Sequence, residues 1–296
     1  MKIFITGVES FIGRYLVDIL QKKNFQVLGI DSEKKNFSTK KFNINDKDLF
    51  KIIPKKCDCL IHLAAVSTSN SFKKNLSKSF ETNVNGTFNV MQAATKKKVK
   101  QIIFASSEWV YGEDKSSKIK NEKNRISIQK ISSDYTLSKI LGEQITEYYS
   151  AKNKINCTIL RFGIVYGPRI KNINISAVES IISTLMSKKK LIVGSKKTAR
   201  RFIYVTDLCE AIYKSIGIKG IIKFNVTGDK LINLDMIQKE ALKNLGKKIK
   251  IIETNKSSFN IRNIDNTSFK KITKWKPKID IHKGIKNIID SLRKNK

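Results

Sequence analysis

The stretch that decides the fold is FITGVESFIGRYL, residues 4 to 16. It runs from a β-rich apolar segment through a glycine-containing turn into residues whose apolar side chains recur at helical spacing. Gly7 ends the strand, and Gly13 lies inside the start of the helix. Backbone N–H groups at such a helix N-terminus, near Phe11 and Ile12, are suited to hold a pyrophosphate. Ser10 replaces the middle glycine of the usual fingerprint, which weakens the match, although serine is small enough for close approach.

A second feature of the same kind is Asp31, which ends the next apolar strand, FQVLGID, roughly 20 residues beyond Gly13. An acidic residue there can accept hydrogen bonds from an adenosine ribose and would repel a 2′-phosphate. We therefore expect NAD as the cofactor and regard NADP as the weaker alternative. The basic side chains of Arg14, Lys34 and Lys35 keep that alternative open.

The rest of the first half alternates between strand-like and helix-like segments. CDCLIHLAA (57–65) and VKQIIFASS (99–107) are typical of buried strands, and residues 77–98 and 132–152 are expected to form long helices. Short links between them predict an α/β fold, a doubly wound parallel (Rossmann) sheet covered on both faces. After about Gly167 the pattern loosens, which predicts a smaller α+β substrate-binding region at the C-terminal side of the sheet. The expected domains are 1–167 and 168–296, although their segments can interleave.

Composition narrows the choice of partners. The chain carries 59 Lys and Arg against 25 Asp and Glu, a net charge of +34 that suits an anionic partner. Its lysines lie in scattered clusters rather than in one stripe interleaved with aromatics, so we expect compositional bias and no nucleic acid. No apolar run reaches the ~18 residues that span a membrane, and the early first strand leaves no room for a signal peptide. Four cysteines and two histidines predict no metal site and a soluble, cytoplasmic protein.

DYTLSK, residues 134 to 139, places Tyr135 and Lys139 four residues apart. On a helix such residues lie one turn apart on one face. A cation beside a phenol favours the phenolate, so we expect the pKa of Tyr135 to fall from about 10 toward working pH and to suit a general acid or base. In a chain this rich in lysine, the spacing alone has little weight.

Together these motifs resemble the extended short-chain dehydrogenase/reductase family, in its NAD-dependent nucleotide-sugar epimerase/dehydratase branch. The resemblance covers nearly the whole chain, in the same order. The matching segments are TGVESFIG (6–13), CLIHLAA (59–65), NVNGTFNV (83–90), FASSEWVYG (104–112), the Tyr-x-x-x-Lys pair, LRFGIVYGPR (160–169), ARRFIYVTD (199–207) and WKP (275–277).

The resemblance implies roles for residues of these segments. Tyr135 would take a proton from a sugar hydroxyl while hydride leaves the same carbon for NAD, Lys139 would lower the tyrosine pKa and bind the nicotinamide ribose, and Ser107 would position the hydroxyl. Further cofactor contacts are implied for Asn43, Ile44, Leu63, Ala64, Ala65 and Asn83. For the substrate, the resemblance implies Ser107, Glu108, Arg200 and Arg262, the arginines through the diphosphate. A homodimer through the helices near 80–97 and 132–152 is also implied.

Three departures from the family pattern bear on the reaction. Dehydratases of this branch carry an Asp-Glu pair after the serine, and here the pair is Glu108-Trp109. An indole cannot act as a general acid or base, so a 4,6-dehydratase is disfavoured. Ile164 replaces an asparagine common in epimerases, and Arg201 replaces an acidic residue, which leaves the substrate open.

The leading interpretation is an NAD-dependent epimerase of a nucleotide-linked sugar that works through a transient 4-keto intermediate. An NAD(P)H-dependent reductase of a 4-keto-deoxy-sugar nucleotide would use the same three residues. A non-catalytic nucleotide or RNA binder is the alternative from another class, suggested by the charge. The sequence does not identify the sugar or the nucleotide base.

Overall fold

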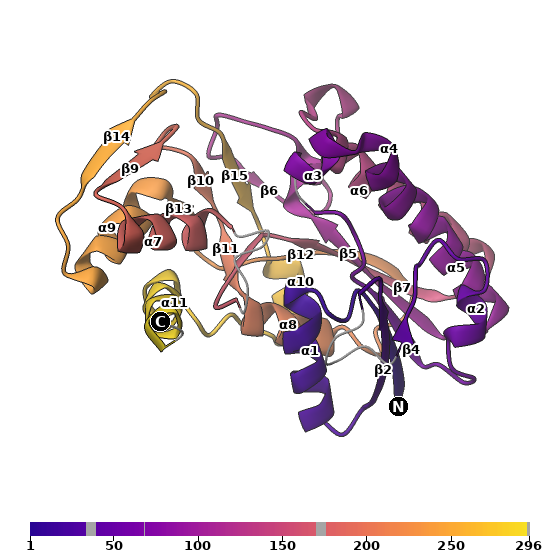
Figure 1. Cartoon of the computed structure of the whole chain (residues 1–296). Coiled ribbons are helices and arrows are strands. Elements are labelled where there is room, and N and C mark those ends of the chain that lie inside the picture. Colours follow the sequence, from indigo (N-terminus) through magenta and orange to yellow (C-terminus); the bar gives the residue numbers. More distant parts are fainter. Residues whose placement is uncertain (34–39, 68, 170–175, 295–296) are drawn as a thin grey trace. The chain divides into compact units, whose positions relative to one another are not determined.

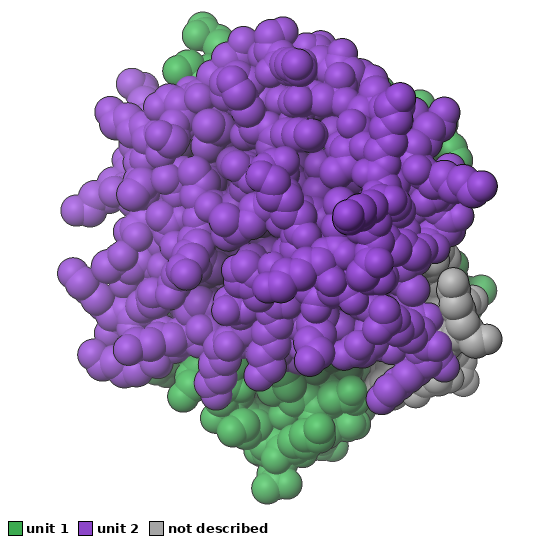
Figure 2. Space-filling model, turned by 90° about the vertical axis from the view of Figure 1, so that its left-hand side faces the viewer, with its two compact units in different colours: residues 1–112, 126–161, 209–224 green, residues 113–125, 162–208, 225–296 purple. Residues whose placement is uncertain are grey.

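The computed structural model describes residues 1–33, 40–67, 69–169 and 176–294. The chain forms two compact units whose segments alternate along the sequence (Figure 2). Unit 1 comprises Met1–Gly112, Ile126–Arg161 and Cys209–Phe224, and unit 2 comprises Glu113–Arg125, Phe162–Leu208 and Asn225–Lys296. The functional domains expected at 1–167 and 168–296 remain a prediction.

Unit 1 is built on a seven-stranded sheet with the strand order β12-β7-β5-β4-β1-β2-β3, and the predicted α/β doubly wound fold is confirmed (Figure 1). Its strands are β1 (Lys2–Thr6), β2 (Gln26–Asp31), β3 (Lys40–Lys41), β4 (Cys59–His62), β5 (Gln101–Ser107), β7 (Asn156–Phe162) and β12 (Ile221–Val226). The pairs from β5 through β4, β1 and β2 to β3 are parallel. Every residue of β4 and β5 is buried, as expected for strands covered on both faces.

Helices flank this sheet, with α1 on one side and α4, α5 and α6 on the other (Figure 1). The helical segments of unit 1 are α1 (Phe11–Lys22), α2 (Leu49–Ile52), α3 (Ser69–Lys74), α4 (Leu76–Phe80), the π-helix η1 (Glu81–Asn85), α5 (Gly86–Lys96), the 3₁₀-helices η2 (Glu108–Tyr111) and η3 (Ile128–Lys130), and α6 (Asp134–Lys152). The helix expected over 77–98 is therefore a continuous run that contains one π turn. Such turns occur frequently at functional sites.

The carboxyl ends of the central strands lie side by side. Thr6 at the end of β1 pairs with His62 at the end of β4, and His62 pairs with Phe104 of β5. Since the chain winds outward in opposite directions from β1 and β4, this is the switch point at which open α/β sheets bind ligands. The residues that follow β1, β2, β4 and β5 are thus placed at one edge of the sheet within unit 1.

Unit 2 is a smaller α+β assembly. It contains a four-stranded sheet of order β13-β10-β15-β6 and the two-stranded pairs β11-β8 and β14-β9. The strands are β6 (Ile119–Lys120), β8 (Ile164–Tyr166), β9 (Lys190–Val193), β10 (Ala199–Arg200), β11 (Phe202–Tyr204), β13 (Ile232–Asn233), β14 (Lys250–Glu253) and β15 (Ile261–Ile264). The helices are α7 (Ala177–Ser187), α9 (Leu234–Leu245), α10 (Thr267–Thr273) and α11 (Ile281–Lys294), and α8 (Val205–Lys214) passes from unit 2 into unit 1.

The polar segment after Gly112 supplies one strand of unit 2. Its strand β6 pairs in parallel with β15, where Asn263 lies opposite Ile119 and Ile264 opposite Lys120. Asn263 also donates a hydrogen bond to the carbonyl of Ser117, at 2.8 Å. This polar and basic stretch is therefore held by long-range pairing. No helix among the described residues has the length and apolar character required to cross a bilayer.

Candidate functional site

The turn after β1 has the geometry that its glycines predict. Gly7 has a φ of +77°, and a Cβ on it would lie 2.6 Å from the backbone nitrogen of Ala64. A Cβ on Gly13 would lie 2.5 Å from the carbonyl oxygen of Gly7, so both positions require glycine. Ser10 is the N-cap of α1, and its Oγ accepts the N–H of Gly13 at 3.0 Å. Serine at this position therefore stabilises the helix whose N-terminus follows the carboxyl end of β1.

Asp31 turns toward the same loop. Its Oδ2 accepts the backbone N–H of Glu9 at 3.0 Å, which fixes the carboxylate at the end of β2. Arg14 is held by Glu9, through an ion pair of 3.3 Å and a hydrogen bond of 3.1 Å from its Nε to the carbonyl. These contacts hold the side chain of Arg14 at the turn. Lys34 and Lys35 lie outside the described residues.

His62, at the carboxyl end of β4, lies in a chain of buried hydrogen bonds that sequence reasoning did not anticipate. Its Nδ1 is 2.7 Å from Thr6 Oγ1, and its Nε2 is 3.1 Å from Thr87 Oγ1. Thr87 donates to the carbonyl of Asn83 at 2.6 Å, so Nε2 must carry the imidazole proton and Nδ1 must accept. Burial, aided by the charge of Lys139, lowers the pKa of His62 to about 3 and keeps the ring neutral.

The other cofactor candidates have distinct surroundings. Asn83, on the π turn, accepts from the N–H of Val66 and donates to its carbonyl and to Ser138 Oγ, so its amide already braces the segment that follows β4. That segment contains Leu63, Ala64 and Ala65. Ile44 is a core residue, and Asn43 accepts the N–H of Asn45 at 3.0 Å.

Ser107, Tyr135 and Lys139 come together within unit 1. Ser107 ends β5 and is 7% exposed, and Tyr135 hydrogen-bonds to it from the first turn of α6. Lys139, one turn further on, is buried with its Nζ 6.0 Å from the centre of the tyrosine ring. The Nζ donates a hydrogen bond of 2.8 Å to the carbonyl of Ala105. The i, i+4 spacing therefore places phenol and ammonium on one face of α6, against the end of β5.

The expectation that the pKa of Tyr135 falls is wrong for this structure. Burial raises the pKa of Tyr135 to about 12, which the hydrogen bond from Ser107 opposes and the charge of Glu108 reinforces. Burial also lowers the pKa of Lys139 to about 8, with Glu143 acting in the opposite direction. Desolvation outweighs the neighbouring cation here, because Lys139 is buried, Tyr135 is partly buried and the ammonium is directed at a backbone carbonyl.

Two aromatic side chains flank the tyrosine. Phe72 of α3 meets the Tyr135 ring edge-on with 5.9 Å between ring centres, and Trp109 of η2 does so at 6.4 Å. Trp109 occupies the place expected for a second carboxylate, while the retained Glu108 is completely buried. Sequence reasoning missed Phe72, because nothing in the sequence places α3 beside α6. The wall beside the phenol is therefore apolar.

The two arginines predicted to bind the substrate belong to unit 2. Arg200 and Arg262 are register partners on the parallel strands β10 and β15, so their side chains lie on the same face of the sheet. Both are buried, at 7% and 1% exposure. Arg200 donates 2.7 Å hydrogen bonds to the carbonyls of Ala199 and Asn260, and Arg262 lies 3.6 Å from a carboxylate oxygen of Glu113.

The residues around the switch point fit a dinucleotide. A glycine turn with a positive φ leads into a capped helix N-terminus, which suits a pyrophosphate, and a fixed carboxylate at the end of β2 suits a ribose. These residues would hold the pyrophosphate and the adenosine ribose of the cofactor, and the Ser-Tyr-Lys set would face the nicotinamide ribose and ring. The arrangement can move a proton to or from a hydroxyl beside a redox cofactor.

Comparisons with known proteins show the family of the chain. A family model described as "NAD dependent epimerase/dehydratase family" matches residues 3–220. A putative UDP-glucose 4-epimerase of Methanocaldococcus jannaschii is 30% identical over 99% of each chain. A dTDP-D-glucose 4,6-dehydratase of Dictyostelium discoideum is 31% identical over 80% of this chain, which spans 61% of that relative. The crystal structure of a Thermotoga maritima UDP-glucose 4-epimerase with UDP-glucose superposes with a TM-score of 0.88 and 22% identity over 100% and 99% of the two chains, a similarity of fold.

Proposed function

The chain belongs to the NAD-dependent epimerase/dehydratase family, whose cofactor is NAD, and we propose that it epimerises a nucleotide-linked sugar through a transient 4-keto intermediate. The observation that carries the proposal is the gathering of Ser107, Tyr135 and Lys139 at the end of β5, with the indole of Trp109 beside the phenol in the place expected for the second carboxylate of a dehydratase. Similarity to the putative UDP-glucose 4-epimerase of Methanocaldococcus jannaschii supports the same reaction.

Each of the three side chains has a separate task in this proposal. Tyr135 takes the proton of the sugar C4 hydroxyl and later returns it to the C4 oxygen. Ser107 donates to Tyr135 and holds the reacting hydroxyl in line. The ammonium of Lys139 stabilises the phenolate from one turn away. The chemistry that NAD supplies when bound is reversible acceptance of the C4 hydride.

The environment of the phenol favours epimerisation over dehydration. Loss of water beside a ketone requires an acid and a base that address the neighbouring carbons. Glu108 offers one buried carboxylate, and the next residue, Trp109, presents an indole edge to Tyr135. Phe72 and Trp109 supply neither an acid nor a base to the transient ketone. Its reduction by hydride on the opposite face is therefore the favoured outcome.

For the substrate we propose a nucleoside diphosphate sugar held partly by Arg200 and Arg262. The two residues are register partners whose side chains lie on one face of the sheet, and guanidinium forks match the oxygens of a diphosphate. We also propose the homodimer through α5 and α6 and a cytoplasmic location. Light scattering after size-exclusion chromatography would measure the oligomeric state.

The reaction is tested by incubating the protein with UDP-glucose, UDP-galactose and their N-acetyl forms, without added NAD, and following the sugars by NMR. Interconversion of one pair is the expected result, and Tyr135→Phe serves as the inactive control. Failure to interconvert any pair would count against epimerisation. Stoichiometric consumption of NADH or NADPH with a 4-keto-deoxy-sugar nucleotide would identify the reductase instead.

A further inference from the structure

A buried ion pair joins strand β7 to α6, the helix that carries Tyr135 and Lys139. Arg161 of β7 donates from Nε and Nη2 to the two carboxylate oxygens of Glu143 on α6, at 2.9 and 2.7 Å. The two side chains are 3% and 1% exposed. Although burial disfavours its cation, the bonds and charge of Glu143 raise the pKa of Arg161. The pair is therefore ionised, and bidentate geometry makes it directional.

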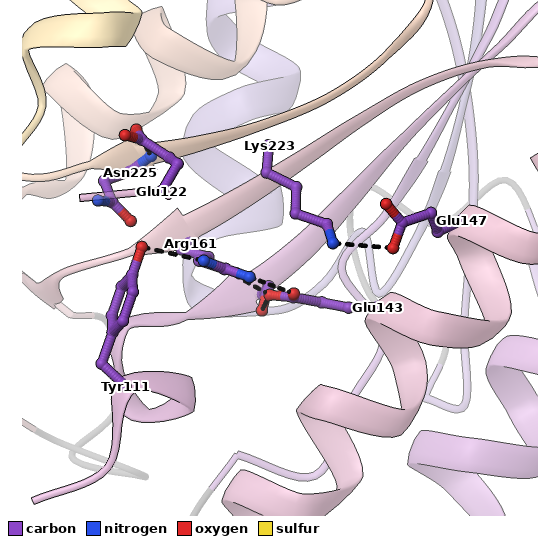
Figure 3. Close-up of polar contacts among 8 residues, drawn as sticks. Tyr111, Glu122, Glu143, Glu147, Arg161, Lys223 and Asn225 are labelled. Carbon is purple, nitrogen blue, oxygen red and sulfur yellow. Dashed lines mark hydrogen bonds and ion pairs between the residues drawn. The ribbon is translucent and has the colours of Figure 1, made fainter. Parts of the chain in front are cut away.

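The pair connects to both sides of Ser107. Ser106 donates its hydroxyl to Glu143 Oε1 at 2.5 Å, and Arg161 Nη1 donates to Tyr111 Oη at 3.0 Å. The guanidinium carbon also lies 5.0 Å from the centre of the Tyr111 ring. Figure 3 shows Arg161 between Tyr111 and Glu143, joined to both. Ser106, which precedes Ser107, and Tyr111, at the end of the turn that follows Ser107, are thus both hydrogen-bonded to the Glu143–Arg161 pair.

Glu143 belongs to α6, the helix that also carries Tyr135 and Lys139. Tyr135, Lys139 and Glu143 follow one another at intervals of four residues along α6, so they occupy one ridge of the helix. The Lys139 ammonium, in turn, donates to the carbonyl of Ala105, the residue before Ser106. Polar contacts therefore run from this ridge to Ala105, Ser106, Ser107 and, through Arg161, Tyr111.

We propose that the Glu143–Arg161 pair is a positioning device, which fixes the segment carrying Ser107 against the helix carrying Tyr135 and Lys139. The inference rests on the proposed function for the roles of those three groups. A buried pair is poor evidence for stability, because apolar side chains of similar volume often serve as well. Here the pair matters because its hydrogen bonds have fixed directions. It links β5, η2, α6 and β7 around the reacting hydroxyl.

Ser106→Ala and Tyr111→Phe test the device with little risk to folding, because each removes one hydroxyl and leaves the ion pair. We expect each to lower kcat several-fold, and their combination to lower it about 10- to 100-fold with an unchanged KM, as misplaced catalytic groups do. Glu147→Gln is the matched control. Glu147 lies one turn further along the same ridge, is 36% exposed and pairs with Lys223 at 2.8 Å (Figure 3), so kcat should not change. A kcat at the wild-type value in the double hydroxyl variant would overturn the proposal.

A second comparison separates positioning from stability. Glu143→Gln leaves the buried guanidinium of Arg161 without its charged partner, so it should lower both Tm and kcat. Glu143→Leu combined with Arg161→Met should restore Tm but not kcat. Recovery of both would show that the pair is only structural. The charges facing Lys139 are those of Glu143 and, behind it, Arg161, with the neutral His62 and Tyr135 beside it. Loss of Glu143 should therefore lower the pKa of Lys139 as well, whereas Ser106→Ala should not change it.

A structural readout makes the test independent of the reaction. Crystal structures of the wild type and Ser106→Ala show directly where the Ser107 hydroxyl lies relative to Tyr135. Displacement of the hydroxyl supports the positioning role even if no tested sugar is epimerised, in which case only the proposed function fails. An unmoved hydroxyl in the variant overturns the positioning role whatever the substrate is.

Discussion

The ammonium of Lys139 donates its hydrogen bond to the carbonyl of Ala105, at 2.8 Å, and lies 6.0 Å from the centre of the Tyr135 ring. This places a buried cation between the strand that ends in Ser107 and the helix that carries the phenol. Burial lowers the pKa of Lys139 to about 8, so folding works against its charge at neutral pH. The site therefore contains a group whose charge serves the proposed reaction and costs stability.

Lys139→Met should separate these two effects. Without the ammonium, stabilisation of the phenolate is lost, and we expect kcat to fall by about 100-fold or more. The desolvation cost also disappears, while the Ala105 carbonyl loses its donor, so the free energy of unfolding at pH 7 should rise by about 1–2 kcal/mol. Urea denaturation measures the second effect, with Lys152→Met on the exposed side of the same helix as the control. A variant that is both less stable and inactive would contradict this account.

The wild type should also show this cost in its pH dependence. The folded-state pKa of Lys139, about 8, lies below the unfolded value of 10.5, so between these values the unfolded chain binds more protons. Stability from this group therefore rises with pH across that window. Urea denaturation at a series of pH values should find the slope in the wild type and a smaller slope in Lys139→Met. Equal slopes would mean that Lys139 is not desolvated as described.

His62 predicts a complementary dependence in acid. Its folded-state pKa of about 3 lies below the ordinary 6.5, so the unfolded chain takes up a proton between these values and stability falls as the pH drops. At pH 4 the loss should be about 3 kcal/mol. His62→Gln should be less stable at pH 7 but should lose less between pH 6.5 and 4. The other histidine, His282, is exposed beside Glu240, and His282→Gln should keep the acid slope of the wild type.

Local sequence was sufficient where one element contains the whole feature. The turn from Gly7 to Gly13, the buried strands and the Tyr135–Lys139 spacing are patterns within a few residues, and the structure has each of them. Ser10 looks like a weakened fingerprint in the sequence, yet it is a helix cap. The roles of the site residues remain predictions.

Features that depend on packing between distant segments could not be predicted. The pKa of Tyr135 rises because the folded chain encloses it, and no local pattern reports enclosure. Phe72 and Arg161 reach the site from separate elements, and the register that pairs Arg200 with Arg262 is set by the sheet. Sequence alone names the residue types that the chemistry needs and leaves their environment undetermined.

The carboxylate of Asp31 should decide between the two dinucleotides. It is fixed by the N–H of Glu9 at the end of β2, where it can bind a ribose and repel a 2′-phosphate. We expect Asp31→Asn to weaken NAD binding about 10-fold and to narrow the preference for NAD over NADP, measured by calorimetry with each dinucleotide. Asp18→Asn, on the same βαβ unit but away from the turn, is the control. An unchanged ratio of the two affinities would remove Asp31 from the recognition of the ribose.

Glu113 and Arg262 give the last prediction, which concerns substrate affinity. Arg262 is 1% exposed and its Nη2 lies 3.6 Å from the Glu113 carboxylate, so a diphosphate that binds this arginine must compete with a charge already present. Arg262→Met should raise the Kd for UDP by about 10-fold, because a charge-assisted contact is lost. Glu113→Gln should lower that Kd about twofold to fivefold, and more at low ionic strength than at high. Calorimetric titration of UDP at two salt concentrations makes the measurement, and Asp114→Asn, next to Glu113 and paired with Lys120 instead, is the control. If Arg262→Met binds UDP as the wild type does, the arginine does not contact the diphosphate and the site must lie elsewhere on unit 2.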